Sequence, residues 1–238
     1  MSPKPPASRR PVRGAADFED EFSVSRETVA KLSSYEESLR QWQRTINLVA
    51  PSTLPDTWER HFADSAQLFA LAPKGARRWL DLGSGAGFPG LVLAMLLSGS
   101  PGSAEARVTL VESDQRKAAF LREVARKTGL AVDIVCDRIE KPATQAKLVS
   151  RETGQCGNWD VITARALAPL PRLLDLAAPY FSPDTVGLFL KGREAQAEIK
   201  AAEDRWAFEA ELHPSQTDDD GRVVVVRALR AKREGYSR

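Results

Sequence analysis

Cysteine and histidine are scarce in this sequence, and no apolar run is long enough to cross a membrane. The 238 residues include two cysteines, Cys136 and Cys156, and two histidines, His61 and His213. Two cysteines do not make a disulfide framework, and the two histidines lack the spacing of a zinc site. No apolar stretch approaches the ~20 residues that span a bilayer, and the amino terminus has no segment resembling a signal peptide. These absences predict a metal-free protein of a reducing cytoplasm.

The charge is divided unevenly along the chain. Residues 1–16 carry four basic side chains and no acidic one, and residues 227–238 carry five basic side chains and one acidic one. Because the whole chain carries a formal charge of +2, the part between these ends is mildly acidic. Basic tails add salt-sensitive affinity for nucleic acid, and they serve equally well as solvated ends that keep a protein soluble. A nucleic-acid site on the folded body therefore has to be a local patch.

The first third of the chain predicts a tail followed by a helical cap. Residues 1–22 are rich in proline and charge, which predicts a disordered basic tail. From Ser25 onward, apolar residues recur at helical spacing and form one stripe, made of Val29, Leu32, Leu39, Trp42 and Ile46. Pro51 and Pro55 end this pattern, and a second helix is expected over 56–71. Residues 23–75 are therefore interpreted as an amino-terminal helical cap.

From residue 76 to residue 230, expected strands alternate with helices, which predicts an α/β domain with a mostly parallel sheet. The strands are expected over 78–82, 107–111, 131–136, 159–164 and 185–190, and the clearest helices over 91–97 and 115–128. The end of the domain differs, because strands over 205–212 and 222–229 are joined by a polar turn. This pattern predicts a final antiparallel hairpin. Residues 231–238 are expected to form a second basic tail.

Residues 79–90 carry the most informative pattern of the chain. The first expected strand runs into a loop with four glycines, and an apolar helix follows. Glycine lets backbone N–H groups approach a ligand closely because it has no Cβ atom. Glu112 follows the second strand (or Asp114, if that strand ends later), where an acid can accept hydrogen bonds from ribose hydroxyls. The sequence therefore predicts an adenosine-containing ligand at the carboxyl ends of the strands, with Asp81 near its amino-acid end.

Two cofactors compete for this loop. Gly85-x-Gly87-x-x-Gly90 satisfies the dinucleotide pattern, which predicts a nicotinamide-dependent oxidoreductase. That pattern expects its first glycine directly after the strand, where this chain has Gly83, and counted from Gly83 it fails because Phe88 replaces the third glycine. Asp81-x-Gly83-x-Gly85-x-Gly87 is instead similar to motif I of the class I S-adenosylmethionine-dependent methyltransferases. That resemblance implies a Rossmann-like sheet closed by an antiparallel hairpin, with S-adenosyl-L-methionine as cofactor.

Several further strings occur in an order that resembles one subfamily, the RsmG family, also called GidB. They are Trp42-x4-Asn47-Leu48, Arg60-His61-Phe62-x-Asp64-Ser65, Gly87-Phe88-Pro89-Gly90, Asp137-Arg138-Ile139-Glu140, Arg165-Ala166 and Leu190-Lys191-Gly192. The resemblance covers about residues 25–229. Its members are bacterial enzymes that methylate N7 of one guanine of 16S ribosomal RNA, conventionally position 527. The stretches 99–106 and 143–157 are longer than the family usually needs, and the basic tails are peculiar to this chain.

The resemblance implies two sets of site residues. The cofactor is expected to contact Gly83, Phe88, Ile139, Glu140 and Arg165, with Asp81, Gly85, Gly87 and Glu112 completing that cleft. Asn47, Arg60, His61 and Asp64 are expected at the mouth of the site. Other roles stay open, because Arg60 and Asp64 have the spacing of a helix-stabilising ion pair. Asn47 can equally be a helix C-cap, His61 a structural histidine, and Phe88 a core residue.

Methylation of guanine N7 requires no general base, because N7 carries a lone pair and no proton. The enzyme has to desolvate N7 and align it with the methyl group, a proximity effect. Arg138, Arg165 and Lys191 are expected at the carboxyl ends of strands, where they would contact RNA and position the guanine. An arginine there is expected to bind guanine O6, because a donor on N7 would block the attack.

Other chemistries fit less well. Cys136 ends a strand and is interpreted as a buried apolar residue, not as the nucleophile of a pyrimidine methyltransferase. The Asp/Asn-Pro-Pro-aromatic loop of exocyclic-amine methyltransferases is missing after the fourth strand. A non-catalytic binder with a methyltransferase fold that serves ribosome assembly is the third hypothesis. The expected partner is 16S ribosomal RNA within the small subunit or an assembly intermediate, and the protein is expected to be a cytoplasmic monomer.

Overall fold

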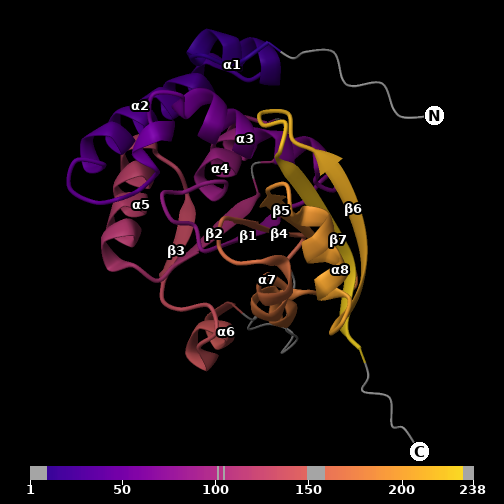
Figure 1. The fold of residues 1–238 in the computed structure, drawn as a ribbon. Helices are drawn as coiled ribbons and strands as arrows, with labels where there is room; N and C mark the ends of the chain where they lie inside the picture. Colours follow the sequence, from indigo (N-terminus) through magenta and orange to yellow (C-terminus); the bar gives the residue numbers. More distant parts are fainter. Residues whose placement is uncertain (1–9, 101, 104, 149–158, 233–238) are drawn as a thin grey trace, which may run out of the picture.

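Helices and strands alternate along the chain, which the computed structural model describes over residues 10–100, 102–103, 105–148 and 159–232 (Figure 1). The strands are β1 Arg78–Leu82, β2 Arg107–Glu112, β3 Val132–Cys136, β4 Val161–Arg165, β5 Val186–Lys191, β6 Trp206–Pro214 and β7 Arg222–Ala231. The α-helices are α1 Ala15–Phe22, α2 Arg26–Trp42, α3 Asp64–Ala66, α4 Gly90–Gly99, α5 Gln115–Thr128, α6 Pro142–Leu148, α7 Leu170–Ala177 and α8 Ala195–Ala202. A π-helix covers Trp58–Ala63, and 3-10 turns cover Pro51–Thr53, Gln67–Leu71 and Ala178–Tyr180.

The strands form one sheet in the order β3-β2-β1-β4-β5-β7-β6. β1 to β5 are parallel, whereas β7 is antiparallel to both β5 and β6. The prediction of a mostly parallel α/β sheet with an antiparallel carboxyl-terminal hairpin is therefore confirmed. The last strand, β7, lies between β5 and β6, and its four consecutive valines, Val223 to Val226, are all buried. A continuous apolar run is typical of a strand that is covered on both faces.

The alternation of side chains along each strand divides the core into two layers. On β1, Trp79 packs in the cluster that includes residues of α2, α4 and α5, whereas Leu80 packs in the cluster with α7 and α8. On β7, Val223 and Val225 belong to the first cluster, and Val224 and Val226 to the second. This follows from the two-residue period of a strand, which points successive side chains to opposite faces. The sheet is thus sandwiched between two helical layers (Figure 1).

The helices flanking the glycine loop begin and end at recognisable signals. In α4 every residue from Gly90 to Leu97 is buried, as expected for a helix enclosed on all sides. The Asp114 side chain caps α5 by accepting from the N–H groups of Arg116 and Lys117, and Gly129 ends it in the left-handed region at φ 64°. The two helices begin at the same end of the sheet, because each follows the carboxyl end of a parallel strand.

The prediction of disorder through residue 22 is wrong for residues 15–22, which form α1. Phe18 is fully buried and packs against Phe22 and Trp58, with ring centroids 4.6 Å and 5.7 Å away. The Val12 N–H also donates to the Glu59 carboxylate, at 2.6 Å. The signal lay in the i,i+4 spacing of the two phenylalanines, and the prolines and charges before them obscured it.

The second cap helix, expected over 56–71, is a π-helix followed by a short α-helix and a 3-10 turn. Asn47 is no C-cap, because α2 ends at Trp42 and is capped at Gln43. Cys136 is half-buried rather than enclosed in the core, and Cys156 lies outside the described residues, as does most of 143–157. Within the described ranges, no helix combines the length and the apolar character needed to cross a bilayer.

Candidate functional site

Two clefts meet at the carboxyl ends of the parallel strands. The first, of about 550 Å³, lies above β1, β2 and β3 and is lined by the glycine loop. The second, of about 660 Å³, lies between the π-helix, the end of β5 and the turn between β6 and β7. Leu48, Arg165 and Ala166 line both clefts. The strand order reverses between β1 and β4, and α/β sheets bind their ligands at such a switch point.

The backbone N–H groups of the glycine loop are largely used within the protein. Ser84 donates to Val111 O at 3.0 Å, Gly87 donates to Ser84 O at 2.7 Å, and Phe88 donates to the same oxygen at 3.2 Å. The Gly85 N–H donates to the Glu112 carboxylate at 2.8 Å. These groups are therefore not free to surround a pyrophosphate, as a dinucleotide loop requires. The geometry favours a ligand that the loop encloses by shape.

Two glycines of the loop are required by both conformation and space. Gly83 has φ 67°, and a Cβ there would lie 2.6 Å from Leu167 Cδ1. Gly87 has φ 96°, and a Cβ there would lie 2.5 Å from Leu91 Cδ1. Residues other than glycine rarely adopt a positive φ of this size. Gly83 and Gly85 line the first cleft, whereas Gly87 packs against the interior and shapes the loop from behind.

Glu112 is the acid of the first cleft. Its side chain lines the cleft although the residue is only 7 % exposed. One carboxylate oxygen accepts from Gly85 N–H, and the other accepts from Asp114 N–H at 2.7 Å. A carboxylate has about four acceptor positions, so two remain for ribose hydroxyls. Asp114, the alternative acid, caps α5 and is not among the residues that line the cleft, and the geometry therefore favours Glu112.

Phe88 is the centre of a stack at the boundary of the two clefts. Its ring lies 4.8 Å from the His61 ring and 5.2 Å from the Tyr35 ring, at angles of 19° and 22°. The Arg165 guanidinium lies over the same ring at 4.8 Å, a cation–π contact. The Tyr35 hydroxyl donates to Ala86 O and so holds the loop from below. Phe88 is both a core residue, 3 % exposed, and a residue that lines the first cleft.

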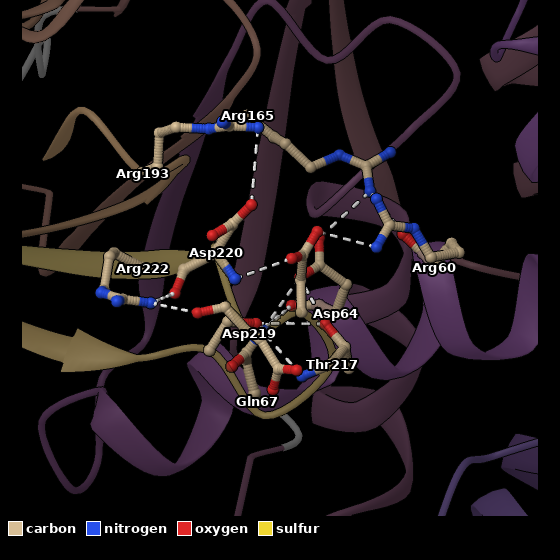
Figure 2. A network of polar contacts seen from close by, with 12 residues as sticks. Arg60, Asp64, Gln67, Arg165, Arg193, Thr217, Asp219, Asp220 and Arg222 are labelled. Carbon is tan, nitrogen blue, oxygen red and sulfur yellow. Dashed lines mark hydrogen bonds and ion pairs between the residues drawn. The ribbon is translucent and has the colours of Figure 1, made fainter.

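An ion pair connects the two clefts. Arg165 Nη1 lies 3.3 Å from Asp64 Oδ2 and also donates to Arg60 O at 3.2 Å. Both ionic side chains are less than one-fifth exposed, so the pair is partly shielded from water. The expected helix pair between Arg60 and Asp64 is absent from these contacts, because Arg60 instead pairs with Asp218 at 2.8 Å. Arg60 belongs to the π-helix and Asp64 begins α3, and the two side chains have different partners (Figure 2).

His61 is a neutral imidazole whose tautomer is determined by its neighbour. The Thr53 hydroxyl donates to Ala50 O at 2.8 Å, so it has to accept from His61 Nε2–H, also at 2.8 Å. Nδ1 then carries the lone pair, and among the described residues it has no hydrogen-bond partner. Burial, and after it the nearby positive charges of Arg165 and Arg60, lower the pKa of His61 to about 3.

Replacing His61 with phenylalanine is expected to flatten the dependence of stability on pH. Between the folded pKa of about 3 and the unfolded pKa of about 6.5, only the unfolded chain binds the proton. Stability contributed by neutral His61 is therefore present above the unfolded pKa and is lost as the pH falls. From about pH 7.5 to about pH 5.5, the wild type should lose about 1.4 kcal/mol more unfolding free energy than His61→Phe. Urea unfolding at both pH values measures this difference, and equal losses would contradict a neutral His61.

The other predicted residues are distributed between the clefts and the core. Ile139 and the exposed Glu140 line the first cleft beside Arg138, whose side chain is 69 % exposed. Lys191 lines the second cleft, where its ammonium group lies 2.6 Å from Glu198 and donates to Ala168 O. Asn47 is exposed outside both linings, and the neighbouring Leu48 lines both.

Asp81 lies beneath the loop rather than at the surface of a cleft. It is 1 % exposed, accepts from the Thr163 hydroxyl at 2.7 Å, and lines neither cleft. Burial raises its pKa to about 6, against the opposing hydrogen bonds from Thr163 and Ser84. A direct contact between Asp81 and a cofactor stays a prediction. The position indicates that Asp81 supports the start of α4 from below.

Sequence reasoning missed several residues that line the clefts. Lys117, Leu167 and Arg172 belong to the first, and Arg193, Asp218, Asp220 and Arg222 belong to the second. The residues of the first group follow the carboxyl ends of β2 and β4, either directly or within the first two turns of the next helix. That position in the sequence was a signal that could have identified them. The second group comes largely from the turn between β6 and β7, and its place opposite the π-helix depends on the pairing of β7 with β5.

Comparisons with known proteins agree with this geometry. The family model described as GidB, rRNA small subunit methyltransferase G, matches residues 28–230. A ribosomal RNA small subunit methyltransferase G of Parvibaculum lavamentivorans is 54 % identical over 207 residues, covering 87 % of this chain and 86 % of the relative. Its namesake from Rhodospirillum centenum is 51 % identical and covers 88 % of each chain.

Solved structures are similar in fold at low identity. The O-methyltransferase from Bacillus cereus in complex with SAH has a TM-score of 0.55 at 18 % identity, covering 90 % of this chain and 98 % of that one. The O-methyltransferase TomG from Streptomyces achromogenes, in complex with SAM, has a TM-score of 0.55 at 14 % identity, covering 90 % and 96 %. At these identities the likeness shows the fold alone, the α/β sheet of class I methyltransferases.

Proposed function

The chain belongs to the GidB family of rRNA small subunit methyltransferases G, and from this premise we propose that it methylates ribosomal RNA of the small subunit with S-adenosyl-L-methionine. The finer statement of the proposal is that the acceptor is N7 of one guanine of 16S ribosomal RNA, conventionally position 527. The observation that carries the proposal is the meeting of two clefts at Arg165 and Ala166, one shaped for an adenosine ligand and the other open to a second reactant.

The first cleft suits an adenosine sulfonium by the chemistry of its lining. Glu112 has free acceptor positions for ribose hydroxyls, and Ile139, which is 7 % exposed, offers an apolar surface to adenine. Gly83 and Leu167 line the same cleft, and a Cβ atom at Gly83 would collide with the Leu167 side chain and displace it. Phe88 lines the same cleft and carries Arg165 over its ring. When bound, S-adenosyl-L-methionine supplies an electrophilic methyl group on a positively charged sulfur.

The residues around the shared wall have to align two reactants and exclude water. Guanine N7 needs no deprotonation, so positioning is the main contribution, worth up to ~7–11 kcal/mol for well-oriented reactants. Arg165 can donate toward guanine O6 while leaving N7 open. Its charge is balanced by Asp64 at 3.3 Å, which reduces its repulsion of a cationic cofactor. The low pKa of His61 keeps a third positive charge out of this region.

The proposal is tested by transfer of tritiated methyl from S-adenosyl-L-methionine to small ribosomal subunits from a strain that lacks this gene, with naked 16S RNA in parallel. The product RNA is then cleaved chemically at 7-methylguanine. Label at a single guanine near position 527 is the expected result. Label at another atom or in another RNA would contradict the proposed acceptor and leave only the methyl transfer itself supported. Because the folded body is mildly acidic, we also propose that the assembled subunit or an assembly intermediate, rather than naked RNA, is the substrate of a cytoplasmic monomer.

Replacing Arg138 with glutamine is expected to reduce RNA methylation at least about tenfold while leaving cofactor affinity within about twofold. The Arg138 side chain is 69 % exposed at the rim of the first cleft, and its one ion pair among the described residues is a loose 3.8 Å contact with Glu140, so it is available to a phosphate. Methyl transfer at limiting RNA and calorimetry with S-adenosylhomocysteine separate the two effects. Loss of cofactor affinity would move Arg138 to the cofactor site instead.

A further inference from the structure

The arginines at the outer side of the second cleft are paired with carboxylates of one turn. Arg60 Nη1 lies 2.8 Å from Asp218 Oδ2, and Arg193 Nη2 lies 3.5 Å from Asp220 Oδ2. Both aspartates belong to the turn between β6 and β7, residues 215–221, whereas Arg60 comes from the π-helix and Arg193 follows β5. The four side chains are between 36 % and 74 % exposed. Figure 2 shows the turn lying between the two arginines.

The base of this turn is held firmly against the cap. Gln67 is 4 % exposed, its Oε1 accepts from Gln216 N–H at 2.8 Å, and its Nε2 donates to Ser215 Oγ at 3.2 Å. The Thr217 hydroxyl donates to Asp64 Oδ1 at 2.9 Å. Hydrogen bonds made by a buried side-chain amide, such as that of Gln67, stabilise one conformation of the turn. The tip, with Asp218 and Asp220, is therefore presented at a defined place, and its two ion pairs face solvent.

A second anchor comes from the strand that follows the turn. Arg222 Nη1 donates to the carbonyl oxygens of Asp219 and Gly221, at 2.7 Å and 2.6 Å. The guanidinium thus closes the turn on its own backbone and is not paired with a turn carboxylate in these contacts. Arg60 and Arg193 remain as the two cations of the cleft whose main partners are the exposed aspartates.

We propose that the second cleft binds the sugar–phosphate backbone of RNA beside the methylated base, with Arg60 and Arg193 as phosphate ligands, and that Asp218 and Asp220 occupy these arginines in the free protein. The inference rests on the proposed function and adds the residues that receive the substrate. A guanidinium group binds a carboxylate and a phosphate with the same fork of donors. The cleft adjoins the cofactor cleft through Arg165 and Ala166, so a backbone held there lies next to the reacting base.

The exchange of partners makes binding selective. Exposed ion pairs are weak, so a phosphate that reaches both arginines can replace the two carboxylates. An RNA that reaches only one arginine meets the unpaired negative charge of the displaced aspartate and gains little. The turn therefore lowers affinity for unstructured RNA more than for a substrate whose backbone fits both positions.

The direct test neutralises the aspartates. The double variant Asp218→Asn, Asp220→Asn is expected to bind a short fluorescein-labelled single-stranded RNA at least about fivefold more tightly than the wild type, an effect of the size expected for two exposed pairs. The slope of log affinity against log salt should stay close to that of the wild type, because both proteins bind the same two phosphates once the carboxylates are displaced. Fluorescence anisotropy across a salt series measures both quantities.

A matched control separates this effect from a change in net charge. The double variant Glu27→Gln, Glu105→Gln also removes two negative charges, but from other ion pairs at the surface. Glu27 pairs with Lys31 at 3.0 Å and Glu105 with Arg77 at 2.6 Å. Neither acid lines the second cleft. The control is expected to bind RNA within about twofold of the wild type. Equal tightening in both double variants would overturn the proposal, because the effect would then come from net charge alone.

The arginines provide the opposite test. Arg60→Gln, Arg193→Gln should bind the same RNA at least about fivefold more weakly, with a slope shallower by about 1.4 and a raised KM for RNA. Unchanged affinity and slope would overturn the proposal. RNA binding is measured without methyl transfer, so the phosphate site in the second cleft and the proposed methyltransferase function are tested separately. If the wild type methylates small-subunit RNA and the variants bind RNA with the affinity and salt slope of the wild type, only the phosphate site in the second cleft is contradicted.

Discussion

Replacing Glu112 with glutamine is expected to weaken S-adenosyl-L-methionine binding at least about 100-fold, or about 2.7 kcal/mol. Both carboxylate oxygens of Glu112 accept backbone N–H groups, from Gly85 at 2.8 Å and from Asp114 at 2.7 Å. An amide has one acceptor oxygen, so one of these N–H groups would face an NH₂ donor in either orientation. Hydrogen bonds to a charged group contribute ~1.5–3 kcal/mol each, and the proposed ribose contacts would be weakened in addition.

Asp114→Asn is the matched control for this measurement. Asparagine caps a helix as well as aspartate does, so α5 should keep its start, and cofactor affinity is expected to stay within about threefold of the wild type. Isothermal calorimetry gives both affinities, and thermal unfolding verifies that the variants are folded. A Glu112→Gln protein that binds as tightly as the wild type would exclude Glu112 from the site. A loss confined to Asp114→Asn would make Asp114 the ribose acid.

Replacing Gly90 with alanine is expected to be the most destabilising single-methyl change in the loop region. A Cβ atom at Gly90 would lie 2.7 Å from Asp81 Oδ2 and closer still to Leu110 Cδ2. Leu110 and Asp81 are 0 % and 1 % exposed, so neither has room to move away. Overpacking of this kind costs ~1–3 kcal/mol and occasionally more. We expect the upper end, about 3 kcal/mol, which corresponds to a fall in Tm of roughly 6–12 °C for a chain of this size.

Gly192→Ala is the control for the added methyl group. No atom of the described part of the chain lies within 4 Å of a Cβ atom at Gly192, and the φ of Gly192 is outside the left-handed region. Alanine there should leave Tm unchanged or raise it slightly, because it restricts the unfolded chain. Differential scanning calorimetry compares the two variants. A Gly90→Ala protein that melts with the wild type would show that α4 can shift away from β2 and that the close approach is not required.

The Gly90 contact also explains why two cofactor families match this loop in sequence. In both, a glycine at the start of the helix lets it pack closely on a strand, and Gly90 meets that need whichever ligand is bound. The loop amides make the distinction, since those of Ser84, Gly85 and Gly87 are bonded within the protein. The sequence gives the positions of the glycines, but only the folded loop shows which acceptors the N–H groups of the loop bind.

Several predictions of where residues lie followed from local patterns and agree with the structure, whereas the contacts of these residues with a cofactor stay predictions. The expected strands and helices lie within a few residues of the observed ones, and Gly83, Phe88, Glu112, Ile139 and Arg165 all line the first cleft. These residues follow parallel strands directly, and the carboxyl ends of such strands meet at one edge of the sheet. The helix α1, the π-helix and the position of Asp81 beneath the loop were not foreseen.

The sequence by itself determined the α/β alternation, the glycine loop with its acid on the next strand, and the family resemblance, because each depends on residues close together in the chain. Only the tertiary structure decided which charges meet. Arg60 pairs with Asp218 and not with Asp64, and Asp64 pairs with Arg165. These partners are more than 100 residues apart in sequence. Arg60 meets Asp218 because β7 enters the sheet beside β5 and carries its turn to the cap. Arg165 meets Asp64 at the carboxyl end of β4. Periodicity along a chain reports which face is buried, and contacts between distant segments depend on how the sheet is assembled.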